Sequence, residues 1–409
     1  MSHFVFVESN TTGTGRLAVE LLVDEGADVT FVTQKRDRYP FLATERPGLH
    51  VVACDTNDSA VLEARLREIA RARPIDALLT FSTFYVTAVA EVARRLGLPG
   101  LDPEAANLCH QKHLGRQRFR RDGLPTPDFW VVSTEAEVEE VARTVTYPCV
   151  VKPVAESGSA GVRLIESPEA LRAHYRTLAG RTINERGQPL FGEVLIETLL
   201  TGPELSVETL TFGGTTRVIG ITQKRLSEPP WFVELGHVFP AELDEGARTS
   251  VERAVRAGLV AVGLDFGPAH TELRMTEEGP VIVEINPRLA GGMIPELVRW
   301  ATGIDLLRAV LALALGESPA AQATRDEVAG IRFFTARRPG ILRDARGLDD
   351  VRKLATVRDV RIDKPTGASV RAAECATDRL GYVIAAGPDR EAVVRDLDSA
   401  LALVELVID

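Results

Sequence analysis

Short apolar runs alternate with amphipathic segments along the first quarter of the chain. HFVFVE, DVTFVTQ and ALLTF are short and rich in β-branched or aromatic residues, as strands are. Helical patterns from about Arg16 to Glu25 and around Val61 to Ala72 separate these runs. Strands that alternate with helices pair in parallel, because each helix carries the chain back across the sheet. The pattern predicts an N-terminal α/β domain, residues 1–104, with a doubly wound parallel sheet.

The pattern then changes to strands joined by short connections. A basic helical segment at 104–123 precedes them, and Val194–Leu210 reads as two strands around Gly202 and Pro203. An apolar helix, IDLLRAVLALALG, leads into a linker, ESPAAQATRDE. The last part reads as strands, IRFFTA and YVIAAG, with a helix from about Arg390 to Leu403. We expect α+β domains at 105–320 and 330–409.

Composition narrows the class of protein. Of the 409 residues, 45% are hydrophobic, which suffices for roughly two to four domains. No apolar run reaches the length of about 18 residues that a membrane span needs, and MSHFVFVESN lacks the pattern of a signal peptide. The net charge of -10 without a basic cluster argues against nucleic acid, and scattered cysteines indicate a reducing compartment. A cytoplasmic enzyme with small-molecule partners, and neither nucleic acid nor membrane, is expected.

The stretch VEINPRLAGG carries the clearest chemistry. Glu284, Asn286 and Arg288 alternate after an apolar run, so a strand would point all three side chains to one face. Carboxylate and amide oxygens suit Mg²⁺ bound together with substrate phosphates, and a guanidinium beside them can brace a phosphoryl oxygen. Glu272 offers a second carboxylate on a neighbouring strand. This pattern predicts a phosphate and metal site.

A second motif is YPCVVKPVAESGSAGV. A short β-branched run ends in Lys152, and a loop with Ser157, Gly158 and Ser159 follows. Glycines and serines let backbone N–H groups approach an anion, and the lysine adds a positive charge. The loop is not a Walker A loop, since the lysine precedes the glycines. It reads as a flexible cover over phosphates.

A third motif is the strand pair in which Glu197 and Glu204 bracket Gly202 and Pro203. With the first two motifs it resembles the ATP-grasp superfamily over about residues 105–310. The resemblance rests on order and spacing, and its features are Lys152, the Ser/Gly loop, Glu197, Glu204, Glu272, Glu284, Asn286 and Arg288. It implies an ATP-grasp fold in which two α+β subdomains clamp ATP, with a central subdomain at about 125–200.

The resemblance also implies roles for the ATP-binding residues. Lys112 and Lys152 would hold the α- and β-phosphates, and the loop from Glu156 to Val162 would close over the β- and γ-phosphates. Glu197 to Leu200 would form the hinge around adenine, and Glu204 would accept hydrogen bonds from the ribose.

The metal set follows from the same resemblance. Glu272, Glu284 and Asn286 would ligate two Mg²⁺ ions, for which Mn²⁺ can substitute. Arg288 would stabilise the transferred phosphoryl group and the later tetrahedral intermediate.

The segment QKRLSEPPWFVELGHVFP suggests a branch of that family. Glu234 and His237, with the later His270-Thr271-Glu272, resemble the bacterial L-amino-acid ligases and carnosine synthases, where the corresponding residues line the amino-acid pocket. In a regular strand Glu234 and His237 would face opposite ways, so both can line one site only if the chain bends near Gly236. The alternative is that His237 caps a strand. The branch also implies a C-terminal lid or dimerisation domain and a homodimer.

The reaction implied is ADP-forming ligation of a small carboxylate and an amine through an acyl phosphate. One alternative is an ATP-grasp carboxylase or formate-activating purine enzyme, which would share the ATP site. Another is an NAD(P)-dependent oxidoreductase, because Gly13 to Ala18 fits the pattern G-x-G-x-x-A. Ser9 to Thr12 separate these glycines from the strand, however, and no acidic residue ends the second strand. The glycines would then admit a substrate carboxylate to a helix N-terminus.

The basic helical segment holds a further candidate, His110 and His113. No second His or Cys pair accompanies them, so we expect a surface helix instead of a metal site. The arginines after Lys112 are expected to form a solvated face.

Overall fold

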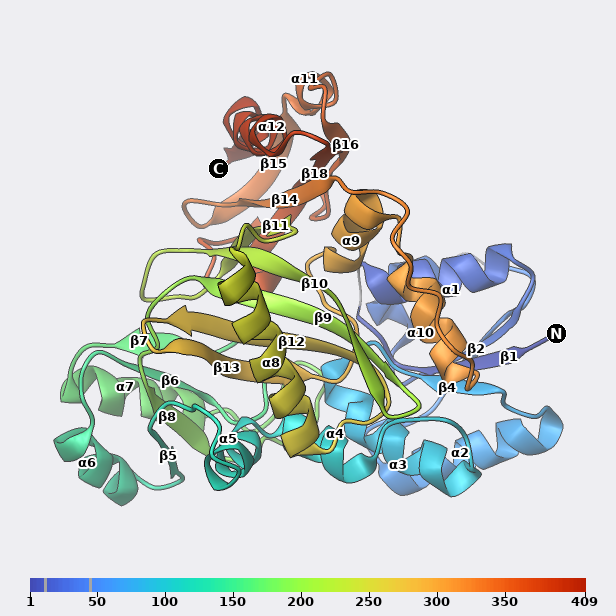
Figure 1. Cartoon of the computed structure of the whole chain (residues 1–409), viewed down its shortest axis with the longest axis horizontal. Coiled ribbons are helices and arrows are strands. Elements are labelled where there is room, and N and C mark those ends of the chain that lie inside the picture. Colours follow the sequence, from blue (N-terminus) through green and yellow to red (C-terminus); the bar gives the residue numbers. More distant parts are fainter. Residues whose placement is uncertain (11–12, 44–45) are drawn as a thin grey trace.

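A computed structural model of the chain describes residues 1–10, 13–43 and 46–409. Its N-terminal part is a parallel sheet, as predicted, and the strand order is β3-β2-β1-β4 (Figure 1). The strands are β1 His3–Val7, β2 Asp28–Thr33, β3 Leu49–Ala53 and β4 Ala77–Leu79. The helices are α1 Thr14–Asp24, α2 Ser59–Ala72 and α3 Val86–Leu96. α3 ends where Gly97 adopts a φ of 69°, a conformation that favours glycine.

Two glycines lie at the start of α1, and Gly15 packs tightly against the preceding loop. Gly13 has a φ of 80°, and the Gly15 N–H donates to Asn10 Oδ1 at 3.0 Å. A Cβ at position 15 would overlap Ser9 Oγ, so Gly15 is needed for packing. Thr11 and Thr12, within the expected spacer Ser9 to Thr12, lie outside the described residues.

Two helices, and not one, connect the N-terminal sheet to the rest. α4 Pro103–His110 ends at Gln111, where the backbone is extended, and α5 Lys112–Arg121 follows. The Lys112 N–H donates to the Val154 carbonyl oxygen at 2.9 Å. This bond fixes the start of α5 beside the strand that carries Lys152.

The central part is a four-stranded antiparallel sheet with order β5-β8-β6-β7 and two helices on one face. Thr134 and Glu137 form a capping box that starts the first helix. A core that includes Val141, Leu171 and Ile196 packs these helices against the sheet. The elements are β5 Phe129–Val132, α6 Glu135–Thr144, β6 Cys149–Pro153, β7 Arg163–Ile165, α7 Pro168–Ala179 and β8 Val194–Thr198.

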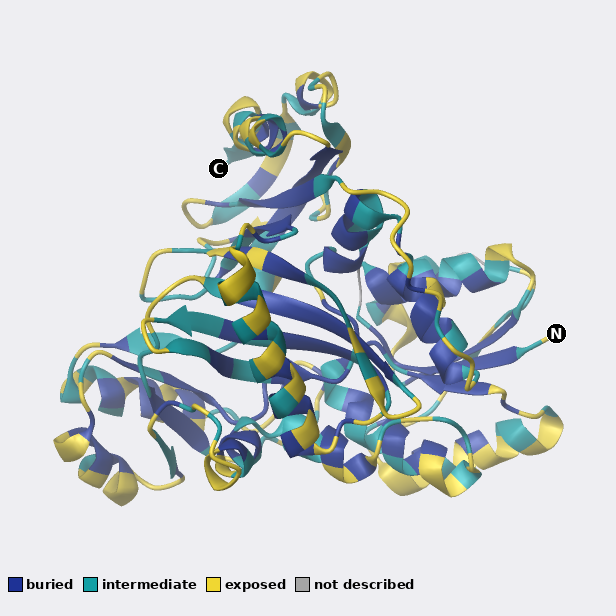
Figure 2. Cartoon of the chain, viewed as in Figure 1, coloured by how far each residue is buried: buried dark blue, intermediate teal, exposed yellow. Residues whose placement is uncertain are grey.

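An eight-stranded sheet, in the order β13-β12-β9-β10-β11-β14-β18-β16, forms the middle of the molecule (Figure 1). Its strands are β9 Glu204–Phe212, β10 Thr215–Leu226, β11 Glu234–Phe239, β12 Gly267–Thr276, β13 Gly279–Asn286, β14 Val328–Thr335, β16 Val357–Ile362 and β18 Arg379–Gly387. Helix α8 Glu245–Val262 packs its apolar side on β12 and β13 through Val255 and Leu259, while its outer side is exposed (Figure 2).

The C-terminal residues continue this sheet instead of standing apart from it. β14 pairs with β11, and β18 pairs with both β14 and β16. Helix α12 Arg390–Leu403, as predicted, packs on these strands. The remaining elements are α9 Ile294–Thr302, α10 Leu306–Ala314, β15 Gly340–Arg346, α11 Leu348–Val351, β17 Ser369–Val370 and β19 Glu405–Ile408.

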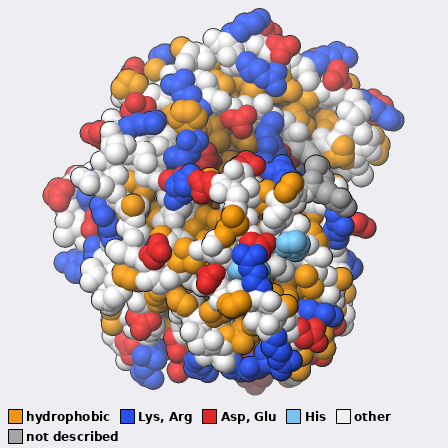
Figure 3. All heavy atoms as spheres, turned by 90° about the vertical axis from the view of Figure 1, so that its right-hand side faces the viewer, with side chains coloured by type: hydrophobic (Ala, Val, Ile, Leu, Met, Phe, Trp, Pro, Cys, Tyr) orange, Lys and Arg blue, Asp and Glu red, His pale blue; other side chains and the backbone are white. Residues whose placement is uncertain are grey.

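The large apolar core joins the N-terminal sheet to α9, α10 and β14. Phe6, Leu297 and Val310 are all buried in it. On the face shown in Figure 3, acidic and basic side chains are interspersed. Among helices of the described residues, none combines the length and the apolar character that a membrane crossing needs.

Candidate active site

A cavity of about 330 Å³ is lined by residues of the N-terminal domain, the central subdomain, the eight-stranded sheet and the C-terminal domain. Small-molecule sites are usually on the order of 300–1,000 Å³. The predicted residues in its wall are Lys112, Lys152, Ser157, Gly158, Ser159, Glu197, Leu200, Glu204, Glu234, Glu272, Glu284 and Arg288. Asn286 and His237 lie beside this wall, Asn286 bonded to Glu284 and His237 near Glu234.

The central subdomain is closed onto the N-terminal domain at the cavity. Arg186, which follows α7, donates from Nη1 to Tyr39 Oη and from Nη2 to the Ser9 carbonyl oxygen, both at 3.0 Å. Asn57 donates to the Arg186 carbonyl oxygen at 3.0 Å. Arg186 and Phe84, a residue of the N-terminal domain, both line the cavity. The structure therefore shows a clamp in which ATP and small substrates would be enclosed.

Two lysines bring positive charge to the part of the cavity where phosphates are expected to bind. Lys152 Nζ lies 2.5 Å from Glu197 Oε2, and Arg116 Nε donates to Glu197 Oε1 at 2.6 Å. Burial opposes ionisation of Glu197, but the two cations outweigh it and hold its pKa at about 2. Burial also lowers the pKa of Lys152. Lys112 Nζ lies 3.0 Å from Glu284 Oε2 and donates to the Glu156 carbonyl oxygen.

Arg116 corrects the prediction that the arginines after Lys112 form a solvated face. It is 1% exposed, because α5 packs between the central subdomain and β13, and Nη2 donates to the Val283 carbonyl oxygen at 2.6 Å. His113 is likewise buried, which corrects the surface-helix prediction for His110 and His113. No group of three metal-ligating His, Cys, Asp or Glu side chains forms there or elsewhere in 1–10, 13–43 and 46–409.

The Ser/Gly loop has a backbone shape suited to anions. Gly158 and Ser159 have φ values of 66° and 61°, which turns successive N–H groups in a way that regular strands do not. Ser159 Oγ donates to the Phe232 carbonyl oxygen at 3.0 Å. The loop is thus held against the segment that precedes β11, at the mouth of the cavity.

The carboxylates expected to bind metal lie side by side. Glu272 and Glu284 are directly opposite each other on β12 and β13, and Asn286 Nδ2 donates to Glu284 Oε1 at 2.7 Å. Burial and the neighbouring Glu284 charge oppose ionisation of Glu272, but Lys224 and His270 together hold its pKa below the usual value. Mg²⁺ commonly takes one or two carboxylates and completes its shell with phosphates and water, so this oxygen set fits the ion.

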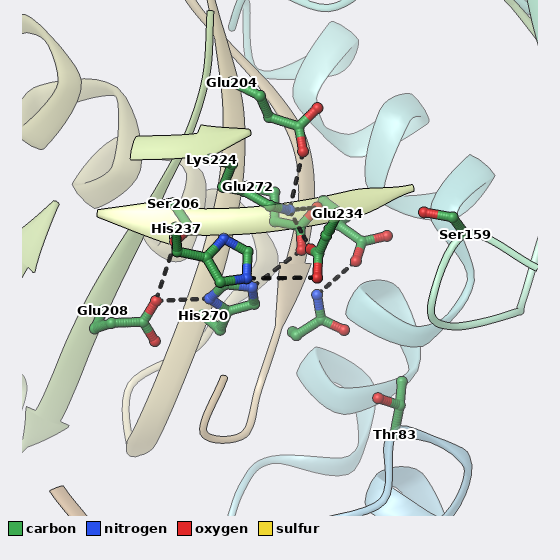
Figure 4. Close-up of polar contacts among 12 residues, drawn as sticks. Thr83, Ser159, Glu204, Ser206, Glu208, Lys224, Glu234, His237, His270 and Glu272 are labelled. Atoms are coloured by element: carbon green, nitrogen blue, oxygen red, sulfur yellow. Dashed lines mark hydrogen bonds and ion pairs between the residues drawn. The ribbon is translucent and has the colours of Figure 1, made fainter. Parts of the chain in front are cut away.

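Lys224 lies among three acidic side chains of the cavity wall (Figure 4). Its Nζ lies 2.9 Å from Glu204 Oε1, 2.7 Å from Glu234 Oε1 and 3.0 Å from Glu272 Oε2. Burial opposes its charge, but the three glutamates raise its pKa well above the usual value. Lys224 could not be identified from the sequence, because its partners come from β9, β11 and β12, which only the folded sheet brings together.

His270 extends this network. Nδ1 lies 2.7 Å from Glu208 Oε1, and Nε2 lies 3.0 Å from Glu272 Oε1. Burial alone would lower the pKa of His270, but the two carboxylates raise it to about 10. The ring is therefore protonated and donates from both nitrogens, which fixes the Glu272 carboxylate.

Glu234 and His237 do lie on one side of β11. Arg225 pairs with Gly236 and Leu226 with Glu234, so Leu235 is an extra residue in a β-bulge. The bulge is the bend near Gly236 that Glu234 and His237 need in order to face one site. His237 Nε2 lies 3.7 Å from Glu234 Oε2 (Figure 4). His237 is 1% exposed, and burial holds its pKa at about 3. Neither ring nitrogen has a hydrogen-bond partner among the residues described.

Arg288 lies just beyond the end of β13 and still joins the set. It donates from Nε to Thr83 Oγ1 at 2.6 Å, from Nη1 to the Leu289 carbonyl oxygen at 2.7 Å and from Nη2 to Asn286 Oδ1 at 3.3 Å. These bonds hold the guanidinium between the N-terminal domain and the carboxylate pair.

Comparison with known proteins agrees with this geometry. Residues 24–100 match the ATP-grasp N-terminal domain and residues 145–296 match the ATP-grasp domain. The chain belongs to the ATP-grasp family. Residues 332–409 match the L-amino acid ligase C-terminal domain 2, the branch that the sequence suggested.

Individual relatives place it among ligases. The chain is 31% identical over 396 residues to the uncharacterised protein y4rH of Sinorhizobium fredii, covering 97% of this chain and 81% of that one. It is 31% identical over 306 residues to carnosine synthase 1 of Gallus gallus, covering 69% of this chain but only 33% of that protein. An L-amino acid ligase from Bacillus licheniformis has the same fold, with a TM-score of 0.86 at 24% identity over 100% of this chain and 99% of that one.

These findings confirm the predicted family, the fold class and the class of reaction. The named relatives include amino-acid ligases, and the chain is a ligase of the ATP-grasp family. Enzymes of the family use ATP with magnesium. The roles of individual residues stay predictions.

Proposed function

We propose that the protein joins the carboxylate of one amino acid to the amine of another through an acyl phosphate. The observation that carries this proposal is the single cavity that combines Lys112 and Lys152, the Glu272–Glu284 pair and the Glu234–Lys224 contact. Phosphate-binding, metal-binding and zwitterion-binding chemistry would thus meet in one enclosed space.

In the first step the substrate carboxylate attacks the γ-phosphate of ATP. Lys112 and Lys152 would hold the phosphate chain, and Arg288 would stabilise the charge that develops on the transferred group. Magnesium, when bound at Glu272, Glu284 and Asn286, neutralises phosphate charge. We propose two such ions, with Mn²⁺ as a substitute, because the two opposed carboxylates can each serve one ion.

The nucleoside part of ATP would lie along the connection between β8 and β9. Glu197 to Leu200 leave β8 at the cavity wall, so their backbone groups are placed to meet adenine. Glu204 follows at the start of β9, and its carboxylate would accept from the ribose hydroxyls. Lys224 and Arg274 already hold that carboxylate in place, at 2.9 and 3.0 Å.

In the second step the amine attacks the acyl phosphate, and phosphate leaves. Glu234 would hold the incoming amine with His237 beside it. The Ser157–Ser159 loop and the closed central subdomain would keep water out, because an acyl phosphate otherwise hydrolyses. Positioning and electrostatics supply the rate, and no covalent nucleophile on the protein is needed.

The test is ADP release measured over pairs of L-amino acids with Mg·ATP. The proposal predicts ADP only when acid and amine are both present, with a product whose mass equals their sum less one water. ADP release that needs bicarbonate or formate instead would favour the carboxylase or formate-activating alternative. Homodimerisation and a cytoplasmic location stay predictions from the family resemblance and the composition.

A further inference from the structure

Part of the cavity wall comes from the C-terminal domain, in which the sequence shows no catalytic set. The wall includes Ala376, Thr377 and Arg379, from the turn that leads into β18. The Ala376 N–H donates to the Gly158 carbonyl oxygen at 3.0 Å. The turn therefore touches the loop expected over the γ-phosphate, so it lies at the end of the site where the acyl phosphate would form.

Arg379 is fixed at this position by three contacts. Its Nε donates to the Ala376 carbonyl oxygen at 3.0 Å, and its guanidinium carbon lies 4.0 Å from the centre of the Phe333 ring. Its Nη1 lies 3.4 Å from Glu234 Oε2. The side chain is 17% exposed, which is its surface toward the cavity.

These contacts leave donors of Arg379 available. A guanidinium has five N–H groups in a planar fork that matches the two oxygens of a carboxylate. Within the part of the chain that the structure describes, Nη2 of Arg379 donates to no protein acceptor. Arg288 differs, because all three of its nitrogens donate to protein oxygens.

The contact between Arg379 and Glu234 is also long for an ion pair of this kind. At 3.4 Å it is longer than the roughly 2.7–2.9 Å of a strong charge-assisted bond. Glu234 already has such a partner in Lys224 at 2.7 Å. Arg379 is therefore held beside Glu234 without being neutralised by it.

We propose that Arg379 binds the carboxylate of the amine-bearing amino acid, so that the C-terminal domain selects the second substrate. This inference rests on the proposed function. An α-amino acid carries its amine and its carboxylate on one carbon, and Glu234 and Arg379 present opposite charges side by side. The carboxylate of the first substrate is consumed by phosphorylation and needs no lasting partner. The phosphates of ATP would have Lys112 and Lys152 as partners, which also line the cavity.

The test compares two nucleophiles with one acid. Hydroxylamine traps an acyl phosphate as a hydroxamate and carries no carboxylate, whereas an L-amino acid does. The acid is whichever proteinogenic L-amino acid gives most hydroxamate with the unaltered protein. For Arg379→Gln we expect kcat/KM for the amino-acid nucleophile to fall ~100-fold, while hydroxamate formation stays within about two-fold.

Controls separate binding from folding. Arg371→Gln removes an exposed arginine that pairs with Asp378 of the same turn and does not line the cavity, so both reactions should stay near the unaltered rate. Arg379→Lys keeps the charge but not the fork, and we expect a loss of roughly ten-fold for the amino-acid nucleophile alone. This variant serves as the test if Arg379→Gln does not fold.

Equal losses with both nucleophiles would overturn the inference, since Arg379 would then act through Glu234 or through folding. Unchanged rates with both would overturn it as well. No hydroxamate and no ADP from the unaltered protein with any of the acids would instead overturn the proposed function, and this inference with it.

Discussion

Two buried lysines, Lys152 and Lys224, line the cavity, and their surroundings are unlike. Lys152 and Arg116 share one carboxylate, that of Glu197. Lys224 lies within 3.0 Å of three carboxylates, and each of these also has a second cationic partner. Burial lowers the pKa of Lys152, while burial of Lys224 is outweighed by its glutamates, which raise its pKa. Lys152 therefore shares its carboxylate with a second cation, whereas Lys224 is surrounded by three carboxylates.

The difference corresponds to what each group of side chains would bind. A nucleoside triphosphate brings negative charge, which suits Lys152 and Arg116, since these two cations share one carboxylate. Metal ions and an amine bring positive charge, which suits the carboxylates gathered around Lys224. Lys224 then has a mainly structural role, because it keeps three acidic groups close together in the folded chain. The predictions below test this division.

The largest effect is expected at Glu284, which pairs with Lys112 and accepts a hydrogen bond from Asn286. Glu284→Gln should lower kcat ~1,000-fold, because a carboxylate at the metal position is lost. The free energy of unfolding should change by no more than about 2 kcal/mol, because Gln keeps the shape of the side chain. ADP release and urea unfolding measure the two quantities.

Glu278→Gln, in the exposed turn between β12 and β13, is the matched control and should leave both quantities unchanged. Activity of Glu284→Gln within a few-fold of the unaltered protein would remove Glu284 from the metal site.

The second prediction separates the two lysines by stability. Lys224→Met should lower the free energy of unfolding by about 3–5 kcal/mol, because three partly buried carboxylates lose their common cation. Lys152→Met should cost less than about 2 kcal/mol, because Arg116 still pairs with Glu197. Urea unfolding of both variants checks the order, and a larger loss in Lys152→Met would refute the division of charge.

The third prediction concerns the pH dependence of stability through His270. Its pKa is raised from 6.5 to about 10 in the folded protein, so its contribution is fully present below about 6.5 and is lost as the pH rises toward 10. Stability lost in His270→Gln should therefore be larger at about pH 6 than at about pH 9.5, by roughly 2–4 kcal/mol. A difference that does not shrink at high pH would show that His270 is not held protonated.

The smallest expected effects are on substrate affinity. Glu234→Ala should raise the KM for an amino-acid substrate about ten-fold and leave the KM for Mg·ATP nearly unchanged. His237→Ala should act in the same direction, since its ring lies against Glu234. Steady-state kinetics with each substrate varied in turn checks both variants. Normal KM values for every substrate would remove Glu234 and His237 from the amino-acid pocket.

The sequence was sufficient where chemistry follows local periodicity. Alternation of strands and helices predicted the parallel N-terminal sheet. Alternation within a strand predicted that Glu284 and Asn286 share a face, with Glu272 on a neighbouring strand. Motif order along the chain predicted the family. Such features depend on neighbours within a strand or a loop, so they can be read without knowing which strands pair.

The residues that the sequence analysis missed depend on long-range pairing. Lys224 faces glutamates from three other strands, and Arg116 lies in a run of arginines whose other members are more exposed. Arg379 reaches the cavity only because β18 joins the same sheet as β11 through β14. Local pattern cannot separate these cations from surface arginines and lysines, since burial is set by the tertiary fold.

The acyl phosphate is the central claim, and the fate of the carboxylate oxygens tests it most directly. An acid labelled with heavy oxygen in its carboxylate is incubated with Mg·ATP and an amine, and the released phosphate is analysed by mass spectrometry. Attack on the γ-phosphate forms an oxygen–phosphorus bond, and the amine then breaks the carbon–oxygen bond. The account predicts one labelled oxygen in each phosphate released with the amide product. Amide formation with unlabelled phosphate would contradict it.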